Sequence, residues 1–125
     1  MIWLAVAAGG ALGSMARHGV NMLFAHLLER AVPYATGTVN LVGSLVIGLL
    51  AALIATGRVH MSNELRTFVF VGILGGFTTF SSFMFDTFTL GHSGNHSLAF
   101  WNVALQTGFG LAAVWAGYRA GVLIG

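Results

Sequence analysis

GGFTTFSSF, residues 75–83, interrupts the third of four long apolar segments in this chain. The run contains two glycines, four hydroxyl side chains and three phenylalanines. Glycines weaken a helix, and hydroxyl groups can take the place of backbone hydrogen-bond partners. We therefore predict that the helix breaks within this run and exposes main-chain oxygens at membrane depth. Exposed oxygens at that depth are typical of a pore or an ion site, whereas a lipid-facing span would be uniformly apolar.

The composition predicts an integral membrane protein. Of the 125 residues, 57% are hydrophobic and only 6% are charged, whereas roughly 25% of an average soluble domain is charged. The chain has no cysteine, which excludes disulfides, thiolate metal sites and cysteine catalysis. Its basic residues, five in all, are too few for a nucleic-acid-binding patch, so no nucleic-acid partner is expected.

Four windows are long enough to cross a bilayer, which takes about 20 mainly apolar residues. They cover residues 2–28, 36–55, 65–90 and 98–124. Short connectors join them at residues 29–35, 56–64 and 91–97. The sequence therefore predicts an all-α membrane protein with one transmembrane four-helix channel domain over residues 1–125. We expect the third helix to be broken near its middle and both termini to lie on the same side of the membrane.

The positive charges give almost no bias in orientation. Arg58, Arg66 and Arg119 favour one side of the membrane, and Arg30 with Arg17 favours the other. A chain with so little bias can insert in both directions, and one four-helix bundle is too small to enclose a guarded pore. We therefore expect a dual-topology, antiparallel homodimer within the lipid bilayer.

Small and polar residues recur at four-residue spacing on three of the predicted helices, which places them on one face of each. They are Gly9, Gly13 and Arg17; Thr36, Asn40, Ser44 and Gly48; and Asn102, Gln106 and Gly110. Close helix packing explains the glycines and Ser44. An amide deep in a span is costly unless it is satisfied, and Asn40 is therefore favoured as an N–H donor to a passing anion. For Asn102 and Gln106, packing and a pore role are both open.

Two of the charged residues inside the apolar windows, Arg17 and Asp86, are candidate site residues. Arg17 needs water, a carboxylate or backbone carbonyls, and it either lines an anion-attracting vestibule or extends to the membrane interface. Asp86 lies one turn beyond Phe83, where it either pairs with an arginine near the helix end or acts directly at the pore. The five histidines fall at helix ends or in loops without ligand spacing, so no histidine metal site is expected.

Phe80 and Phe83 are three residues apart and are therefore neighbours on one helical face. A phenyl ring has a positive edge, so rings presented edge-on favour a small anion that has shed water. Ordinary packing in a phenylalanine-rich protein is the competing explanation. The hydroxyls of Ser81 and Ser82 between the rings, next to a helix break, favour the pore.

The break also offers a cation site. If it lies near the two-fold axis of a dimer, two backbone carbonyls from each subunit, those of Gly75 and Thr78, form a four-oxygen cage for a hard cation such as Na⁺. The charge of that ion would be buried and permanent.

The chain resembles the Fluc (CrcB) fluoride channel family over nearly its whole length, and three stretches carry the resemblance. Residues 9–17, GGALGSMAR, are similar to the first-helix pattern of the family, and residues 37–44, GTVNLVGS, continuing to Gly48, are similar to its second-helix pattern. The run at residues 75–83 resembles the third-helix signature GG-x-TTFSTF, which is the most specific of the three. The chain departs from the family at Ser82, where threonine is usual, and at Gln106, Thr107 and Gly110, where many relatives have serines.

The resemblance implies a dual-topology antiparallel dimer with two F⁻ pores and a structural Na⁺ at its centre. Carried over by position, the carbonyls of Gly75 and Thr78 hold the Na⁺, and Phe80 and Phe83 face the pore. Further positions follow from the same resemblance: Asn40 as a pore-entry donor, Ser81 and Ser82 in the polar track, Asp86 where many relatives have a glutamate, and Gln106 and Thr107 as possible pore residues of the fourth helix.

The leading hypothesis is passive, selective F⁻ export across the inner (plasma) membrane. A second hypothesis is a small dual-topology, proton-coupled multidrug exporter, but such a carrier needs a carboxylate within its first helix and none occurs before Glu29. A third is a non-transporting assembly subunit whose polar stripes serve packing alone. No enzymatic activity is expected, because these residues assemble neither a nucleophile with a base nor a metal cluster.

Overall fold

The computed structural model describes residues 1–28 and 33–125, and every regular element in these ranges is helical. In chain order the elements are α1 (Ile2–Leu27), α2 (Tyr34–Ala55), α3 (Asn63–Arg66), the π-helix η1 (Thr67–Leu74), α4 (Gly75–Phe77), α5 (Phe80–His92) and α6 (His96–Ile124). The predicted all-α fold is confirmed for the described residues. Arg30 and part of the predicted first connector lie outside them.

Three helical stretches among the described residues are long and apolar enough to cross a membrane: Tyr34–Ala55, Asn63–His92 and His96–Ile124. They coincide with the second, third and fourth predicted windows. α1 is continuous over 26 residues, about 39 Å at roughly 1.5 Å per residue, and so has the length of a span. Its polar residues, among them Arg17 and Asn21, lower its hydropathy, and its crossing of the membrane stays a prediction.

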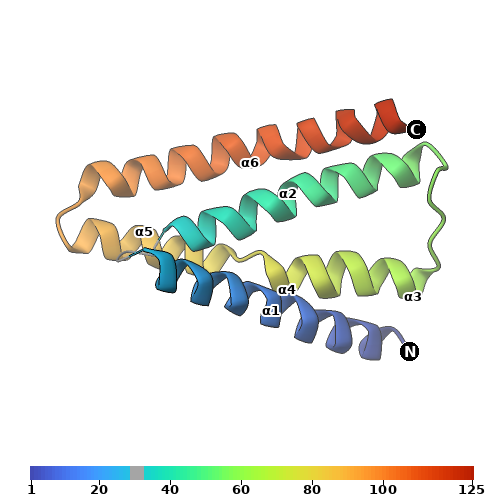
Figure 1. The fold of residues 1–125 in the computed structure, drawn as a ribbon, viewed down its shortest axis with the longest axis horizontal. Coiled ribbons are helices and arrows are strands. Elements are labelled where there is room, and N and C mark those ends of the chain that lie inside the picture. Colours follow the sequence, from blue (N-terminus) through green and yellow to red (C-terminus); the bar gives the residue numbers. More distant parts are fainter. Residues whose placement is uncertain (29–32) are drawn as a thin grey trace.

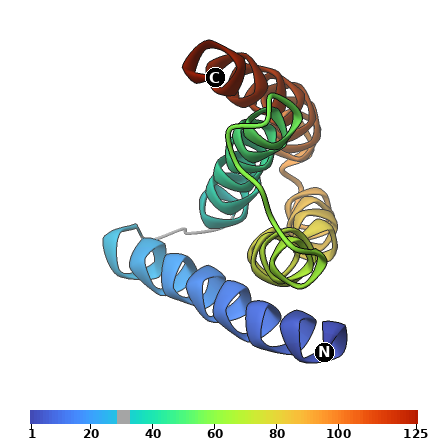
Figure 2. The same cartoon turned by 90° about the vertical axis from the view of Figure 1, so that its right-hand side faces the viewer.

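The helices form two closely packed pairs. α2 runs along α6, while α1 crosses the segment made of α3, η1 and α4 (Figure 1). α5 continues that segment and contacts α6, so it links the two pairs. Toward its C-terminal end α1 diverges from the other helices (Figure 2). The chain termini lie at the same end of the bundle, as the sequence predicts (Figure 1).

Glycines permit the closest approach within each pair. A Cβ on Gly13 would overlap the carbonyl oxygen of Ile73 where α1 crosses η1. A Cβ on Gly48 would likewise overlap the carbonyl oxygen of Val114 where α2 meets α6. Small residues at such crossings let helix backbones pack directly against each other in a membrane. The packing role predicted for these glycines is confirmed.

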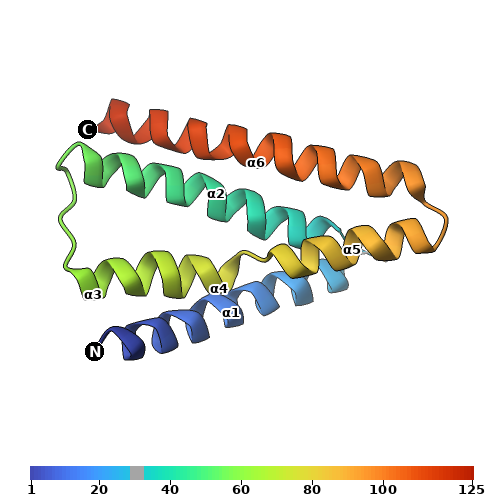
Figure 3. The ribbon, with the colours of Figure 1, turned by 180° about the vertical axis from the view of Figure 1, so that it is seen from behind.

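The third span is broken where α4 ends and α5 begins (Figure 3). Thr78, at φ −84° and ψ 160°, and Thr79, at φ −153° and ψ 123°, are both extended. The Thr79 hydroxyl then caps α5 by accepting a hydrogen bond from the backbone N–H of Ser82, at 3.1 Å. The predicted break is confirmed, but the glycines are not its site: Gly75 and Gly76 are helical, and the two threonines leave the helix because an N-cap residue requires extended backbone.

Candidate functional site

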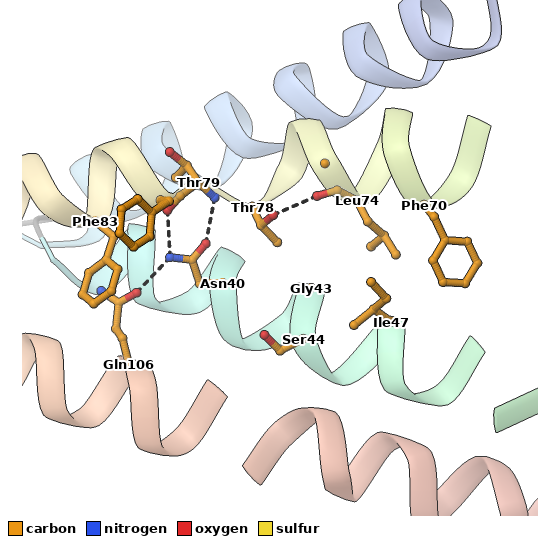
Figure 4. Close-up of a pocket in the computed structure, with 12 residues that line it drawn as sticks. Asn40, Gly43, Ser44, Ile47, Phe70, Leu74, Thr78, Thr79, Phe83 and Gln106 are labelled. Atoms are coloured by element: carbon orange, nitrogen blue, oxygen red, sulfur yellow. Dashed lines mark hydrogen bonds between the residues drawn. The ribbon is translucent and has the colours of Figure 1, made fainter. Parts of the chain in front are cut away.

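The side chain of Asn40 pairs with the backbone of the break. Its Oδ1 accepts a hydrogen bond from the Thr79 N–H at 2.8 Å, and its Nδ2 donates to the Thr79 carbonyl at 3.1 Å (Figure 4). α2 thus supplies the partners that the helix gives up where it unwinds. A backbone group without a hydrogen bond inside a membrane span costs roughly several kcal/mol of free energy. The Asn40 amide therefore stabilises the extended conformation.

Other carbonyl groups around the break divide into two kinds. The Gly76 carbonyl accepts a hydrogen bond from Nε of Arg17 at 3.0 Å, and the Leu74 carbonyl accepts from both the N–H and the hydroxyl of Thr78, each at 3.0 Å. The carbonyl oxygens of Gly75, Phe77 and Thr78 accept no hydrogen bond within the described residues. Backbone oxygens without donors are the groups that an unwound membrane helix offers to a cation.

A cavity of about 400 Å³ lies between α2, α6 and the broken helix. It is lined by Asn40, Gly43, Ser44, Ile47, Phe70, Leu74, Gly75, Thr78, Thr79, Phe80, Phe83 and Gln106. Several of these side chains approach one another around the Asn40 amide (Figure 4). The cavity therefore brings together six of the residues singled out in the sequence, from three separate helical segments: Asn40, Gly75, Thr78, Phe80, Phe83 and Gln106.

The two phenylalanines form an edge-to-face pair. Their ring centroids are 6.1 Å apart and the ring planes meet at 87°, a favourable arrangement for the ring quadrupoles. Phe83 is buried, with 8% of its surface exposed, whereas Phe80 is 72% exposed. One ring is thus enclosed within the chain and the other is largely uncovered.

Gln106 of α6 approaches the same amide from the opposite side. Its Oε1 accepts from Nδ2 of Asn40 at 2.9 Å, and its own Nε2 donates to Oδ1 of Asn102 at 2.9 Å. The first of these bonds connects α2 and α6 at the level of the break, and the second lies within α6. They also satisfy the amides that the sequence marked as costly inside a span.

The remaining predicted site residues do not line this cavity. Ser81 is exposed and Ser82 half-buried, and both lie by the Thr79 hydroxyl at the start of α5. Thr107 is exposed on α6. The pore roles of these three residues stay predictions.

The two charged residues are placed differently from each other. Arg17 is half-buried and donates to the break through Gly76, which is one of the partners that the sequence allowed for it. Asp86 is buried, with 7% of its surface exposed, and its Oδ2 has no hydrogen-bond partner among the described residues. A vestibule role for Arg17 and a pore role for Asp86 stay predictions.

Two residues of the site were not predicted as such. Thr79 was counted only as one hydroxyl of the run, yet it is the N-cap of α5 and the partner of Asn40. A threonine three residues after a helix-weakening glycine pair is the sequence signal for this cap. Ser44 lines the cavity, although its spacing was assigned to packing.

A model of one protein family matches most of the chain. The family is described as CrcB-like protein, Camphor Resistance (CrcB), and the match covers residues 4–118. This chain belongs to the CrcB family. The resemblance seen in the sequence is thereby confirmed, and the broken third span with its phenylalanine pair lies well inside the matched region.

Curated relatives of the CrcB family align along almost the full chain. A protein of Rhodospirillum rubrum is 44% identical over 125 residues, covering 99% of this chain and 97% of its own. One of Aeromonas salmonicida is 45% identical, covering 94% of this chain and 93% of its own, and one of Paracoccus denitrificans is 48% identical, covering 95% and 93%. Each of the three is named a fluoride-specific ion channel, FluC.

Proposed function

We propose that this CrcB-family protein is a fluoride-selective channel that exports F⁻ passively from the cytoplasm across the inner (plasma) membrane. The observation that carries the proposal is the common cavity of the broken helix, the Phe80–Phe83 pair and the amides of Asn40 and Gln106. The names of the aligned relatives support the same conclusion. Transport of an ion, rather than covalent chemistry, accounts for this set of residues.

The cavity offers a dehydrated anion two kinds of partner. Ring edges carry partial positive charge, and the amide N–H of Gln106 and the hydroxyl groups of the lining replace part of the water shell of the ion. Both N–H groups of Asn40, which the sequence favoured as the donor to the anion, are bonded to Thr79 and Gln106 instead. Neither kind of partner is a full positive charge. Binding is then favourable enough for the ion to enter and weak enough for it to leave, as conduction requires.

The proposal includes an antiparallel, dual-topology homodimer of four-helix subunits, with two pores. Phe80 is 72% exposed although it lines the cavity, so the ring has room for a second subunit to cover it. Exposed apolar side chains elsewhere on the bundle face either lipid or that subunit. The dimer also suits the flat distribution of arginines, which allows insertion in both directions.

A structural Na⁺ fits the residues at the break. The carbonyl oxygens of Gly75 and Thr78, which accept no hydrogen bond from residues 1–28 or 33–125, are hard ligands, and one subunit offers only two of the four that the predicted cage needs. The same two oxygens from an antiparallel partner would complete it. The bound ion would supply a fixed positive charge at the dimer interface. Arg17 and Asn40 donate to the neighbouring carbonyls of Gly76 and Thr79, so the carbonyl oxygens of Gly75 and Thr78 stay available for the ion.

The multidrug exporter is not supported. α1 contains no aspartate or glutamate that could exchange protons, and the aligned relatives are named for fluoride. The non-transporting subunit is left as the alternative that a transport assay excludes.

Fluoride efflux from liposomes tests the proposal. The purified protein is reconstituted into vesicles loaded with potassium fluoride, and a fluoride electrode follows release after valinomycin is added. Rapid F⁻ release, with Cl⁻ release from matched chloride-loaded vesicles at the level of empty vesicles, is the expected result. Equal release of both anions would refute selectivity, and no release of either would favour the assembly subunit.

A further inference from the structure

The hydrogen bonds of Asn40 continue through α6 back to α5 as one uninterrupted chain. Asn40 Nδ2 donates to Gln106 at 2.9 Å, Gln106 Nε2 donates to Asn102 at 2.9 Å, and Asn102 Nδ2 donates to the Thr87 hydroxyl at 2.9 Å. The Thr87 hydroxyl donates in turn to the carbonyl of Phe83 at 2.8 Å. Four side chains from three helices are thus connected in series.

Both ends of this chain are fixed by backbone groups. The Thr79 N–H can only donate, so it holds Oδ1 of Asn40 toward itself and turns Nδ2 toward Gln106. At the far end the Phe83 carbonyl can only accept, so the Thr87 hydroxyl points its proton there and presents a lone pair to Asn102. The two constraints demand the same donor direction in every link. The orientation of each amide therefore follows from the backbone of the break and of α5.

The direction of the chain decides which N–H groups remain free. Asn40 donates both of its N–H groups, one to the Thr79 carbonyl and one to Gln106. Gln106 donates one of its two N–H groups to Asn102, and Asn102 donates one of its two to Thr87. Asn40 thus has no N–H left to donate, and in the part of the chain that the structure describes the free amide N–H nearest the break belongs to Gln106.

Gln106 lines two cavities. Besides the cavity at the break, it lines a second one of about 400 Å³ between α2 and α6, which Asn102 and Trp101 also line. Thr87 lines neither of the two. An ion that moved from one cavity to the other would pass the Gln106 amide.

We infer that Asn102 and Thr87 are positioning residues, which hold the Gln106 amide between the two cavities with one N–H free for an anion. The inference rests on the proposed channel function. Without an acceptor at residue 87, Asn102 loses the bond that fixes its direction, and Gln106 loses its fixed acceptor in turn. Gln106 still accepts from Asn40, but its Nε2 no longer has a fixed acceptor, so its free N–H is no longer held toward the passage and efflux falls.

Thr87→Val is the sharpest test, because valine keeps the shape of threonine and removes only the hydroxyl. We expect F⁻ efflux to fall about five- to tenfold, the effect of one lost hydrogen bond transmitted along the chain. Thr87→Ser retains the hydroxyl and should restore efflux to about twofold of wild type or better, on the same reasoning. The matched control is Thr89→Val on the same helix, since Thr89 is exposed and outside the chain. Each variant is first checked for the size-exclusion elution volume and the circular-dichroism spectrum of the wild type.

A double-mutant cycle separates positioning from a general structural effect. Asn102→Leu cuts the chain between Thr87 and Gln106, and should lower efflux by about the same five- to tenfold factor. Adding Thr87→Val to Asn102→Leu should then change nothing further, because Thr87 has nothing left to position. If efflux of the double variant fell by the product of the two single-variant factors, the inference would be overturned. Complete loss of flux in Asn102→Leu alone would overturn it as well. If the wild type conducts but Thr87→Val equals Thr89→Val, the inference fails and the channel stands; if the wild type is silent, both fail.

Discussion

Replacing Asn40 by leucine removes the side chain that pairs with the break while keeping a similar volume. Three hydrogen bonds disappear: those with the N–H and the carbonyl of Thr79, and that with Gln106. Both backbone groups of Thr79 then face an apolar side chain. The extended conformation of residues 78–79 loses the partners supplied by α2.

The size of the effect follows from the number of bonds. At about 1 kcal/mol net for each, their loss destabilises the broken conformation by about 3 kcal/mol, and unsatisfied backbone groups raise that figure. A difference of 3 kcal/mol corresponds to a factor of about 150 in an equilibrium, since each 1.4 kcal/mol is tenfold. We therefore expect F⁻ efflux of Asn40→Leu to fall by about 100-fold.

The assay is efflux from liposomes at a fixed protein density, with vesicles counted so that rate per channel is compared. The matched control is Asn21→Leu, because Asn21 is an exposed asparagine on α1. That variant should conduct like wild type. Asn40→Ser, which retains one donor and acceptor on a shorter side chain, should lie between the two. Efflux of Asn40→Leu within about twofold of wild type would refute the claim that this amide maintains the break, given the cost of three lost bonds.

Three further predictions concern the rings, the cation and the arginine. Phe80→Ile and Phe83→Ile should each strongly reduce F⁻ efflux without dissociating the proposed dimer, as judged by light scattering, because isoleucine fills space but has no electropositive edge; normal efflux in both would contradict a role for the ring edges. Exchange of Na⁺ for the bulky cation N-methyl-D-glucamine on both sides of the membrane should lower F⁻ efflux reversibly, and unchanged efflux after exhaustive exchange would contradict the sodium site. Arg17→Met leaves the Gly76 carbonyl without its donor and should lower the free energy of unfolding in detergent by about 1–3 kcal/mol. Arg119→Met, at an exposed position on α6, should lower it less. Equal effects would contradict the role of the Arg17 bond.

The main features of the fold followed from local composition. Windows of about 20 apolar residues gave three helical stretches at the predicted positions, because a bilayer fixes the length of a span. The glycines and hydroxyls of residues 75–83 placed the break, since both act on the backbone of their own segment. Within that run the exact position was not predicted: Gly75 and Gly76 remain helical, and the break falls at Thr78 and Thr79, where Thr79 is the N-cap of α5.

Contacts between distant segments were beyond a single sequence. Asn40 and Thr79 are 39 residues apart, and Arg17 and Gly76 are 59 apart, so neither pairing leaves a spacing signal along the chain. The sequence showed that Asn40 and Arg17 needed partners at membrane depth, but not which backbone groups supplied them. For the same reason Asn102 and Gln106 stayed open between packing and a pore role. Only the bundle shows that they belong to the network of Asn40.

In the proposed arrangement, carbonyl oxygens of the unwound third span bind sodium at the interface of two opposed subunits, beside rings and amides that pass fluoride. A structure of the protein in lipid nanodiscs with sodium present, determined experimentally at a resolution that shows single ions, tests it most directly. We predict antiparallel subunits, extended backbone at residues 78–79, and density for one cation between the Gly75 and Thr78 carbonyls of both subunits. An uninterrupted helix through residues 75–83, with Phe80 and Phe83 both directed at acyl chains, would contradict the account.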